Sequence, residues 1–129
     1  MIYIKNEKEI ELMEESARVL KLVLKAIEKE IKPGVTTGHL DKVAERVMRE
    51  NGATPSFKGV ECPYEGGKPY RWAICTSVND EIIHGIPSDK VVLKEGDIVS
   101  VRGKGKYRFD GTTNLTKKNR YHVEVSRYC

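Results

Sequence analysis

Residues 6–34 have the sequence NEKEIELMEESARVLKLVLKAIEKEIKPG, and they determine the first element of the structure. Asn6 is followed three residues later by Glu9, a capping-box signature for a helix start, while Pro33 and Gly34 end a helix. Between these signals, apolar residues recur at alternating steps of three and four, as on one face of an α-helix. The expected buried stripe of this helix is Ile10, Met13, Ala17, Leu20, Leu24, Ile27 and Ile31.

A second helix is expected directly after that stop. It begins near Thr36 or Thr37 and ends before Asn51-Gly52, and its apolar positions again follow the helical period. Both apolar stripes are typical of surfaces that face a protein core rather than of cofactor-binding motifs. The expected buried face of the second helix is Leu40, Val43, Ala44, Val47 and Met48.

After the second helix the pattern changes to short apolar segments separated by turn residues. We expect a strand over residues 72–78, a tight turn at Asn79-Asp80 and a hairpin partner over residues 81–86. The segment 62–69 is too rich in proline and glycine for regular structure. Helices followed by strands predict an α+β fold, with two N-terminal helices packed on a mostly antiparallel sheet. The remaining expected strands are residues 98–102 and 120–128.

Composition favours one globular domain over residues 1–129. The chain has a mass of 14.6 kDa, with 39% apolar and 33% charged residues, which argues against disorder. No run approaches the roughly 20 apolar residues of a membrane-spanning helix, and the first residues show no signal-peptide core. We therefore expect no membrane association and a cytoplasmic location. The three cysteines are widely spaced, which predicts reduced thiols rather than a disulfide framework.

Charge is distributed unevenly along the chain. Residues 1–101 carry 15 Lys/Arg and 17 Asp/Glu, whereas residues 102–129 carry 8 and 2. A basic end after a near-neutral body is expected where a chain meets phosphate or another anionic surface, although many basic strands are simply solvated. The sequence leaves both interpretations of this segment open.

The side chains able to act as ligands or bases form no dense cluster in the sequence. His84 is followed by Gly85, which permits a close approach, so it is either a substrate contact or a hydrogen-bonded histidine at a strand end. Cys75 lies within an apolar strand and is interpreted as a small buried hydrophobe rather than a nucleophile. The full set is Cys75, Asp80, Glu81, His84, Asp97 and His122.

Several segments closely resemble type I methionine aminopeptidase, and the resemblance covers residues 1–101. It implies half of a pita-bread fold, in which two pseudo-symmetric halves enclose two divalent ions such as cobalt, manganese or iron. It also implies removal of the first methionine from the N-terminus of nascent peptides. The segments are EIELM at 9–13, KPGVTT at 32–37, PSFKG at 55–59, CTSVNDE at 75–81 and HGIP at 84–87.

The resemblance also shows where this chain departs from the family. Arg102 stands where the first metal-binding aspartate is expected, and Thr112 or Thr113 stands near the second, with Asp110 displaced beside it. The other ligands belong to the second half of the fold. A fixed guanidinium charge repels a cation, so we expect no metal site, no bound cofactor and no peptidase activity from this chain alone.

On the substrate side, the resemblance implies roles for three residues. His84 matches the histidine that hydrogen-bonds the substrate near the scissile peptide bond, here expected to be vestigial. Tyr70 and Cys75 match positions that line the pocket for the methionine side chain. These assignments come from motif position.

The end of the chain resembles a different family, the alpha-L RNA-binding domain, over residues 94–129. Basic residues there can neutralise phosphates and glycines allow close approach of the backbone. Both families can share the segment 93–100, so the chain is interpreted as a chimera of an aminopeptidase-like part, 1–101, and a basic β segment, 102–129. The expected contacts to structured or ribosomal RNA are Arg102, Lys104, Lys106, Arg108, Lys117, Lys118 and Arg120.

Three functional hypotheses follow. The first is a truncated aminopeptidase-like protein that lacks the metal site and binds RNA through its basic segment. The second is a methionine aminopeptidase that is active only with a complementing half. The third is a chain that folds without a specific activity. Half of a two-half fold also leaves an apolar seam, which either pairs with another copy to give a homodimer or becomes an aggregation hazard.

Overall fold

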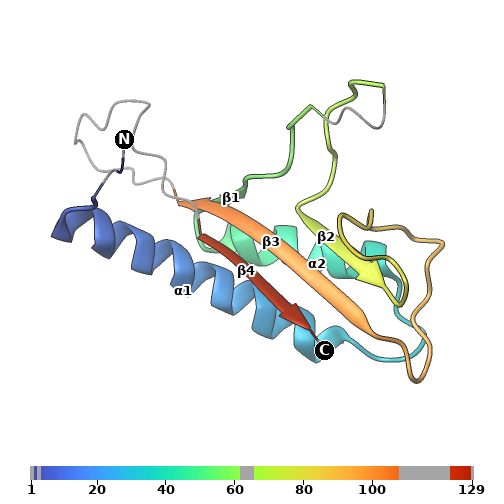
Figure 1. The fold of residues 1–129 in the computed structure, drawn as a ribbon. Coiled ribbons are helices and arrows are strands. Elements are labelled where there is room, and N and C mark those ends of the chain that lie inside the picture. The colour runs from blue at the N-terminus through green and yellow to red at the C-terminus, as the bar shows by residue number, and fades with distance from the viewer. Residues whose placement is uncertain (1, 3, 62–65, 108–122, 129) are drawn as a thin grey trace.

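The computed structural model describes residues 2, 4–61, 66–107 and 123–128. Two helices pack on one face of a small antiparallel sheet, which confirms the predicted α+β arrangement (Figure 1). Both helices are found where the sequence predicts them. The elements are α1 Glu7–Glu30, α2 Thr37–Glu50, β1 Ala53–Pro55, β2 Ile74–Val78, β3 Val99–Tyr107 and β4 Val123–Tyr128.

Strand β3 organises the sheet, because each of the other described strands pairs with it and all pairings are antiparallel. Ser100 to Gly103 pair with both β2 and β4, so these two strands flank β3 on opposite edges. Strand β1 pairs with the distal end of β3, from Gly105 to Tyr107. In the β2–β3 register, Cys75 lies opposite Arg102 and Ser77 lies opposite Ser100.

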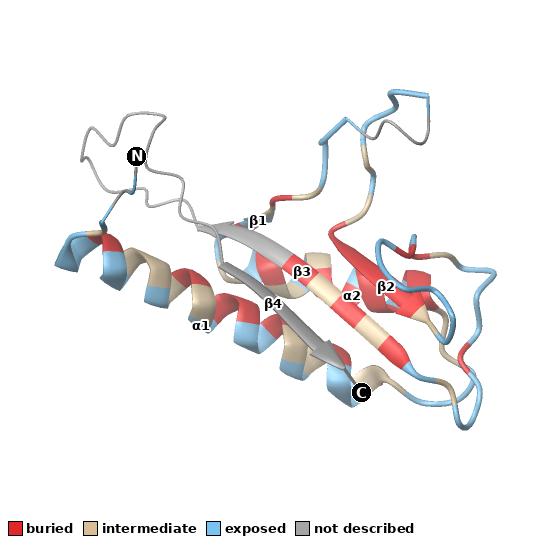
Figure 2. Ribbon diagram, viewed as in Figure 1, coloured by how far each residue is buried: buried red, intermediate tan, exposed pale blue. Residues whose placement is uncertain are grey.

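The core lies between the helices and this sheet. Val99 and Val101 are 2% and 3% exposed, and a methyl group at Gly103 would contact Leu20 and Ile74, so these alternate positions of β3 face the helices. Figure 2 shows buried residues concentrated on the facing sides of helices and sheet. The core residues contributed by the helices are Val19, Leu20, Val23, Ile27, Leu40, Val43, Ala44 and Met48.

The predicted stripe of α1 is wrong in its N-terminal half. Ile10 is 46% exposed and Met13 is only partly buried, whereas continuous apolar burial begins at Val19. From there the helix packs against α2 and the sheet, so Val19 and Val23 join Leu20 and Ile27 in the core. Helical period alone identifies a face, but it does not show how far along the helix the neighbouring layer extends.

The predicted hairpin partner over residues 81–86 is also wrong, because this segment is not a strand. Strand β2 pairs with β3 instead. His84 has φ +60°, a left-handed conformation that interrupts an extended segment. The strand predicted over 98–102 continues to Tyr107, and the last predicted strand is found at Val123–Tyr128, its first residues lying outside the described part.

The start of α1 has a complete capping box. The Asn6 side chain accepts a hydrogen bond from the Glu9 N–H at 2.9 Å, and the Glu9 carboxylate accepts one from the Asn6 N–H at 2.9 Å. Both unpaired donors are thereby satisfied.

We expect Asn6→Ala to lower the free energy of unfolding by about 1 kcal/mol, because the Glu9 N–H loses its acceptor. Asn6→Ser is the control and should retain most of the stability, since serine also caps helices. Chemical denaturation of the three proteins measures the difference. Equal stability of the alanine and wild-type proteins would contradict this role of the cap.

Candidate functional site

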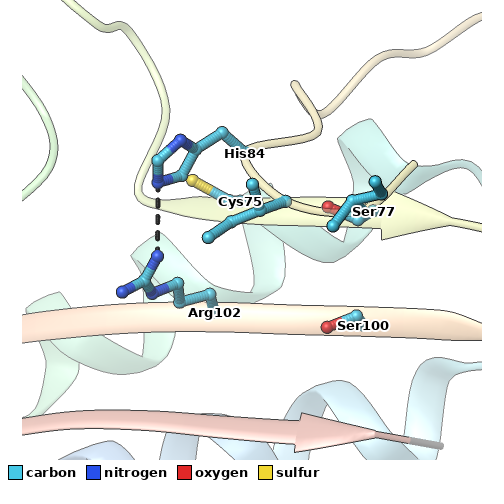
Figure 3. Close-up of a pocket in the computed structure, with 7 residues that line it drawn as sticks. Cys75, Ser77, His84, Ser100 and Arg102 are labelled. Atoms are coloured by element: carbon cyan, nitrogen blue, oxygen red, sulfur yellow. Dashed lines mark hydrogen bonds between the residues drawn. The ribbon is translucent and has the colours of Figure 1, made fainter.

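The face of the sheet opposite the helices carries a row of polar side chains on β2 and β3. Side chains alternate between the two faces along a strand, so residues opposite one another and two apart share a face. The register therefore places Cys75 and Ser77 of β2 beside Arg102 and Ser100 of β3. Figure 3 shows these four side chains together, with the helices behind the sheet.

The segment that follows β2 folds back beside this row and forms a small, partly open cavity with it. Its volume is about 170 Å³. The sheet provides one wall, and the segment 82–84 provides the other (Figure 3). The lining residues are Cys75, Ser77, Ile82, Ile83, His84, Ser100 and Arg102.

His84 and Arg102 meet across the cavity. Arg102 Nη1 lies 3.2 Å from His84 Nε2, and a guanidinium can only donate, so Nε2 is the acceptor and the ring hydrogen is on Nδ1 (Figure 3). The positive φ of His84 aims its ring toward β3. Such backbone conformations persist where the surrounding structure imposes them, often at binding sites.

Gly85 holds the folded-back segment against β2. Its carbonyl accepts from the Thr76 N–H at 2.9 Å, and its own N–H donates to Ser77 Oγ at 3.1 Å. The approach is so close that a Cβ on residue 85 would lie 2.1 Å from the Thr76 carbonyl oxygen. Further along, Ser88 exchanges hydrogen bonds with the Thr37 hydroxyl at the start of α2, which fixes the other end of the segment.

Tyr70 and Cys75, expected to line a side-chain pocket, are brought together by the structure. The Tyr70 hydroxyl donates to the Ile74 carbonyl at 2.9 Å and lies 3.5 Å from Cys75 Sγ. The Tyr70 ring packs edge to face on Trp72, with ring centroids 5.2 Å apart. Cys75 is 7% exposed and lines the cavity, whereas Tyr70 supports it from outside the lining.

Asp41 anchors the start of β2 from helix α2. Its Oδ1 accepts hydrogen bonds from the Ala73 N–H at 2.8 Å and the Ile74 N–H at 3.1 Å. The side chain is buried, and burial raises the pKa of this carboxyl above its ordinary value, although the two backbone hydrogen bonds act in the opposite direction. One buried carboxylate therefore determines where the strand that carries Cys75 begins.

The other acidic candidates lie in the connection between β2 and β3, and two of them accept hydrogen bonds there. Asp97 accepts from the Asn79 side chain at 2.9 Å and from the Lys94 N–H at 2.8 Å, and these hydrogen bonds hold its pKa below the ordinary value. The Glu81 carboxylate accepts from the Val78 N–H at 2.9 Å. Asp80 is exposed, and His122 lies outside the described residues. The cavity lining thus contains no acidic side chain among the residues that the structure describes.

The described residues do not fit a two-metal centre. Within residues 2, 4–61, 66–107 and 123–128, no three His, Cys, Asp or Glu side chains gather where they could hold a metal ion. The cavity offers one thiol and one imidazole whose Nε2 already accepts from Arg102. Bridging carboxylates, which two closely spaced divalent cations require, are missing from this described lining.

Comparison with known protein families shows which family this chain belongs to. The model of metallopeptidase family M24 matches residues 11–117. The chain belongs to this family. As an M24 chain it is 50% identical over 101 residues to the methionine aminopeptidase of Clostridium acetobutylicum, and that match covers 78% of this chain and 38% of the relative. The chain therefore spans well under half the length of this relative.

The fold of this chain matches a part of the pita-bread fold of solved methionine aminopeptidases. The enzyme from Rickettsia prowazekii is 30% identical, with a TM-score of 0.76 over 99% of this chain and 44% of its own. A methionine aminopeptidase from Streptococci is 25% identical, with a TM-score of 0.80 over the whole of this chain and 51% of its own. This M24 chain thus corresponds to an N-terminal portion of such enzymes. In the described parts of this M24 chain, no helix combines the length and apolarity needed to cross a bilayer.

The basic residues expected to contact RNA are only partly described. Arg102 lies in the cavity, next to His84. Lys104 and Lys106 follow it at every second position of β3, opposite Glu124 of β4 and Thr54 of β1. The remaining four, Arg108, Lys117, Lys118 and Arg120, lie outside the described residues.

Sequence reasoning missed Ser77, Ser100 and Asp41. The two serines are two residues from Cys75 and Arg102 on adjacent strands, so strand alternation would have identified them once the β2–β3 pairing was known. Asp41 follows Leu40 on the buried side of α2. An acidic residue next to the buried apolar stripe was the sequence signal that could have identified it as a buried hydrogen-bonding group.

Proposed function

We propose that this chain is a methionine aminopeptidase-like protein without peptidase activity of its own. The observation that carries the proposal is Arg102 in the cavity wall, hydrogen-bonded to His84, where a metal centre would need carboxylates. A guanidinium remains charged at all physiological pH values and repels a divalent cation at close range. On this proposal the cavity would contact a substrate, but its described lining holds no carboxylate through which a metal ion could activate water.

The test is an assay of the purified chain on the peptide Met-Gly-Met with added cobalt, manganese or iron. We expect release of free methionine at the uncatalysed rate, whereas enzymes typically accelerate such reactions by more than about 10⁶-fold. Arg102→Asp supplies a carboxylate and should give weak binding of Mn²⁺ in calorimetry without restoring cleavage. Metal-dependent release of methionine by the wild-type chain would overturn the proposal.

A second candidate function is an aminopeptidase completed by another chain. Its support is a set of exposed apolar side chains: Ile82 and Ile83 in the cavity lining are 93% and 56% exposed, and Ile98, the residue before β3, is 57% exposed. Exposed apolar groups of this kind mark interaction surfaces. A second copy of this chain would give a homodimer, and a C-terminal half like that of a relative would give a peptide-binding site for nascent N-termini.

Light scattering after size-exclusion chromatography, with and without a separately produced C-terminal half of a relative, tests this alternative. A mass of one chain under both conditions excludes it. A complex that releases methionine from Met-Gly-Met would instead assign the activity to the assembled pair.

Binding of structured RNA by the basic segment is the remaining proposal. Its support is the antiparallel β3–β4 ribbon, along which Arg102, Lys104 and Lys106 occupy alternate positions. A cytoplasmic location, where thiols stay reduced, would give access to such RNA. Phosphate contacts make affinity fall steeply with salt, by about tenfold or more between 50 and 200 mM for several contacts. Salt-independent binding, or binding that survives glutamate at positions 102, 104, 106 and 108, would contradict this proposal.

A further inference from the structure

The backbone groups along one edge of the sheet already have partners. This edge consists of β2 and β1, and every second N–H of β2 points away from β3. The Thr76 N–H donates to the Gly85 carbonyl at 2.9 Å. The outward N–H groups of Ile74 and Val78 donate to carboxylates at 3.1 and 2.9 Å. Strand β1 has three residues and ends at Pro55, which has no N–H, so this edge is closed to a further strand.

The register of the sheet determines which backbone groups of β4 point outward. Because the Thr76 N–H points away from β3, Thr76 and Val101 form a pair without mutual hydrogen bonds, and the Val101 groups point toward β4. Val101 and Arg127 therefore form a hydrogen-bonded pair, and bonding to β3 alternates along β4. The residues whose N–H and C=O groups point away from β3 are Glu124, Ser126 and Tyr128.

These outward groups of β4 form an open edge. Among the described residues, β3 is the one strand that pairs with β4, and no described backbone group bonds to the outward groups. Strand β4 lies at the side of the sheet opposite β2 (Figure 1). An edge strand with unpaired N–H and C=O groups is a template for pairing with another strand. The sheet thus has one closed edge and one open edge.

We propose that β4 is an interaction surface, on which a second copy of this chain adds its own β4 antiparallel to the first. The outward residues are evenly spaced about Ser126. A two-fold axis beside Ser126 therefore pairs Glu124 of each copy with Tyr128 of the other, and about six backbone hydrogen bonds satisfy all the outward groups. Because the opposite edge is closed, the assembly ends at a dimer and does not continue into a fibre.

This pairing deepens the second candidate function, on which the choice of another chain as partner rests. It places the contact between the two copies along β4. The exposed Ile82 and Ile83 of the cavity lining belong to the segment after β2, on the other side of β3. A contact through β4 and a contact through these isoleucines therefore involve different parts of the molecule and can be tested separately.

Amide hydrogen exchange of the full chain, combined with sedimentation equilibrium at the same concentrations, tests the pairing. We expect a monomer–dimer equilibrium without larger species. At a concentration about tenfold above Kd, about four-fifths of the chains are paired, so exchange of the Glu124, Ser126 and Tyr128 N–H groups should slow about fivefold. The N–H groups of Val125 and Arg127, which point toward β3, serve as internal controls and should change much less.

Two substitutions at one position test the central pair. Ser126→Pro removes an outward N–H while the hydrogen bonds between β4 and β3 are retained. We expect it to raise the dimer Kd at least about tenfold, because two hydrogen bonds are lost in each dimer. Ser126→Ala keeps the N–H and is the matched control, with the Kd of the wild type. Ile82→Ser, at a residue that is 93% exposed, should also leave the Kd unchanged.

Three results would overturn the proposal. The first is a chain that stays monomeric at all concentrations, including one that associates only with the C-terminal half of a relative. The second is a dimer that Ile82→Ser weakens and Ser126→Pro does not. The third is protection of the outward N–H groups that dilution leaves unchanged, since the edge would then be covered within one chain. The exchange measurement uses the wild-type chain, so it decides the matter even if Ser126→Pro does not fold.

Methionine release from Met-Gly-Met is measured separately on the same preparation. A dimer paired through β4 that releases no methionine would support the contact and exclude peptidase activity of the paired copies. Activity of a complex with the C-terminal half of a relative, without self-association, would support the second candidate function and overturn the β4 pairing. The two failures are therefore distinguishable.

Discussion

Asp41→Ala is expected to lower the free energy of unfolding by about 2–6 kcal/mol, because two buried backbone donors lose their acceptor and each costs about 1–3 kcal/mol when unsatisfied. These donors are the Ala73 and Ile74 N–H groups, both less than 1% exposed as residues. These hydrogen bonds are made by the first residue of β2 and the residue before it, so the strand that carries the cavity wall should loosen together with the core. Urea denaturation of wild type and variant measures the change.

Two other substitutions serve as controls. Asp41→Asn retains the accepting oxygen and should cost clearly less than the alanine variant. Asp89→Ala removes an exposed carboxylate that faces Lys42 at 3.3 Å, and such surface pairs contribute about 0–1 kcal/mol. If Asp41→Ala and Asp89→Ala proved equally stable, the proposed anchoring of β2 by Asp41 would be wrong.

The Asp41 carboxyl also makes the stability of the fold depend on pH, and the direction of its pKa shift determines the sign of this dependence. Burial raises the pKa of Asp41 above its ordinary value of 3.8, so the folded protein keeps a proton that the unfolded chain releases. The contribution of Asp41 to stability is therefore full below pH 3.8 and decreases as the pH rises toward the raised value. Subtracting the pH profile of Asp41→Asn isolates this contribution, since Asp97 and Glu15 have lowered pKa values and act in the opposite direction. A flat difference profile would contradict it.

Gly85→Ala is expected to detach the segment 81–87 from β2. The added Cβ would lie 2.1 Å from the Thr76 carbonyl oxygen and 2.8 Å from Ser77 Cα, and neither backbone atom can move without shifting the strand. Overpacking of this kind costs about 1–3 kcal/mol and occasionally more. The Thr76 N–H, which now donates to Gly85, should lose its protection in amide hydrogen exchange.

Gly103→Ala is the matched control within the same sheet. A Cβ there would meet side-chain atoms of Ile74 and Leu20 at 3.4 Å, an ordinary contact distance. Its effect on unfolding should stay within about 1 kcal/mol. Retained exchange protection at Thr76 in the Gly85→Ala protein would show that the segment does not depend on this close approach.

Local patterns predicted the helices better than the sheet. The cap at Asn6, the break at Pro33-Gly34 and the start of the second helix near Thr36 or Thr37 are short-range signals, and each lies where it was predicted. The partner of β2 is instead about twenty residues away, beyond a turn whose composition looked like that of a hairpin. Short-range turn chemistry cannot distinguish a folded-back loop from a paired strand, because both require the chain to reverse.

Three residues of the candidate site could be singled out from the sequence, but their arrangement could not. His84, Cys75 and Arg102 stand out by residue type or by family resemblance. Their convergence on one cavity requires the β2–β3 register and the left-handed conformation of His84, neither of which has a local signature strong enough to predict. Ser77 and Ser100 can be recognised as lining residues only when that register is known.

Because every described strand pairs with β3, the order in which the ribosome makes the chain constrains how it can fold. While residues 1–98 emerge, the two helices can associate, but β1 and β2 have no partner strand. The apolar faces of α1 and α2 that later pack on Val99 and Val101 remain in water during this interval. Synthesis of β3 then allows β1 and β2 to pair with it, and β4 joins the sheet later, so translational pausing before residue 99 would expose an aggregation-prone helical pair.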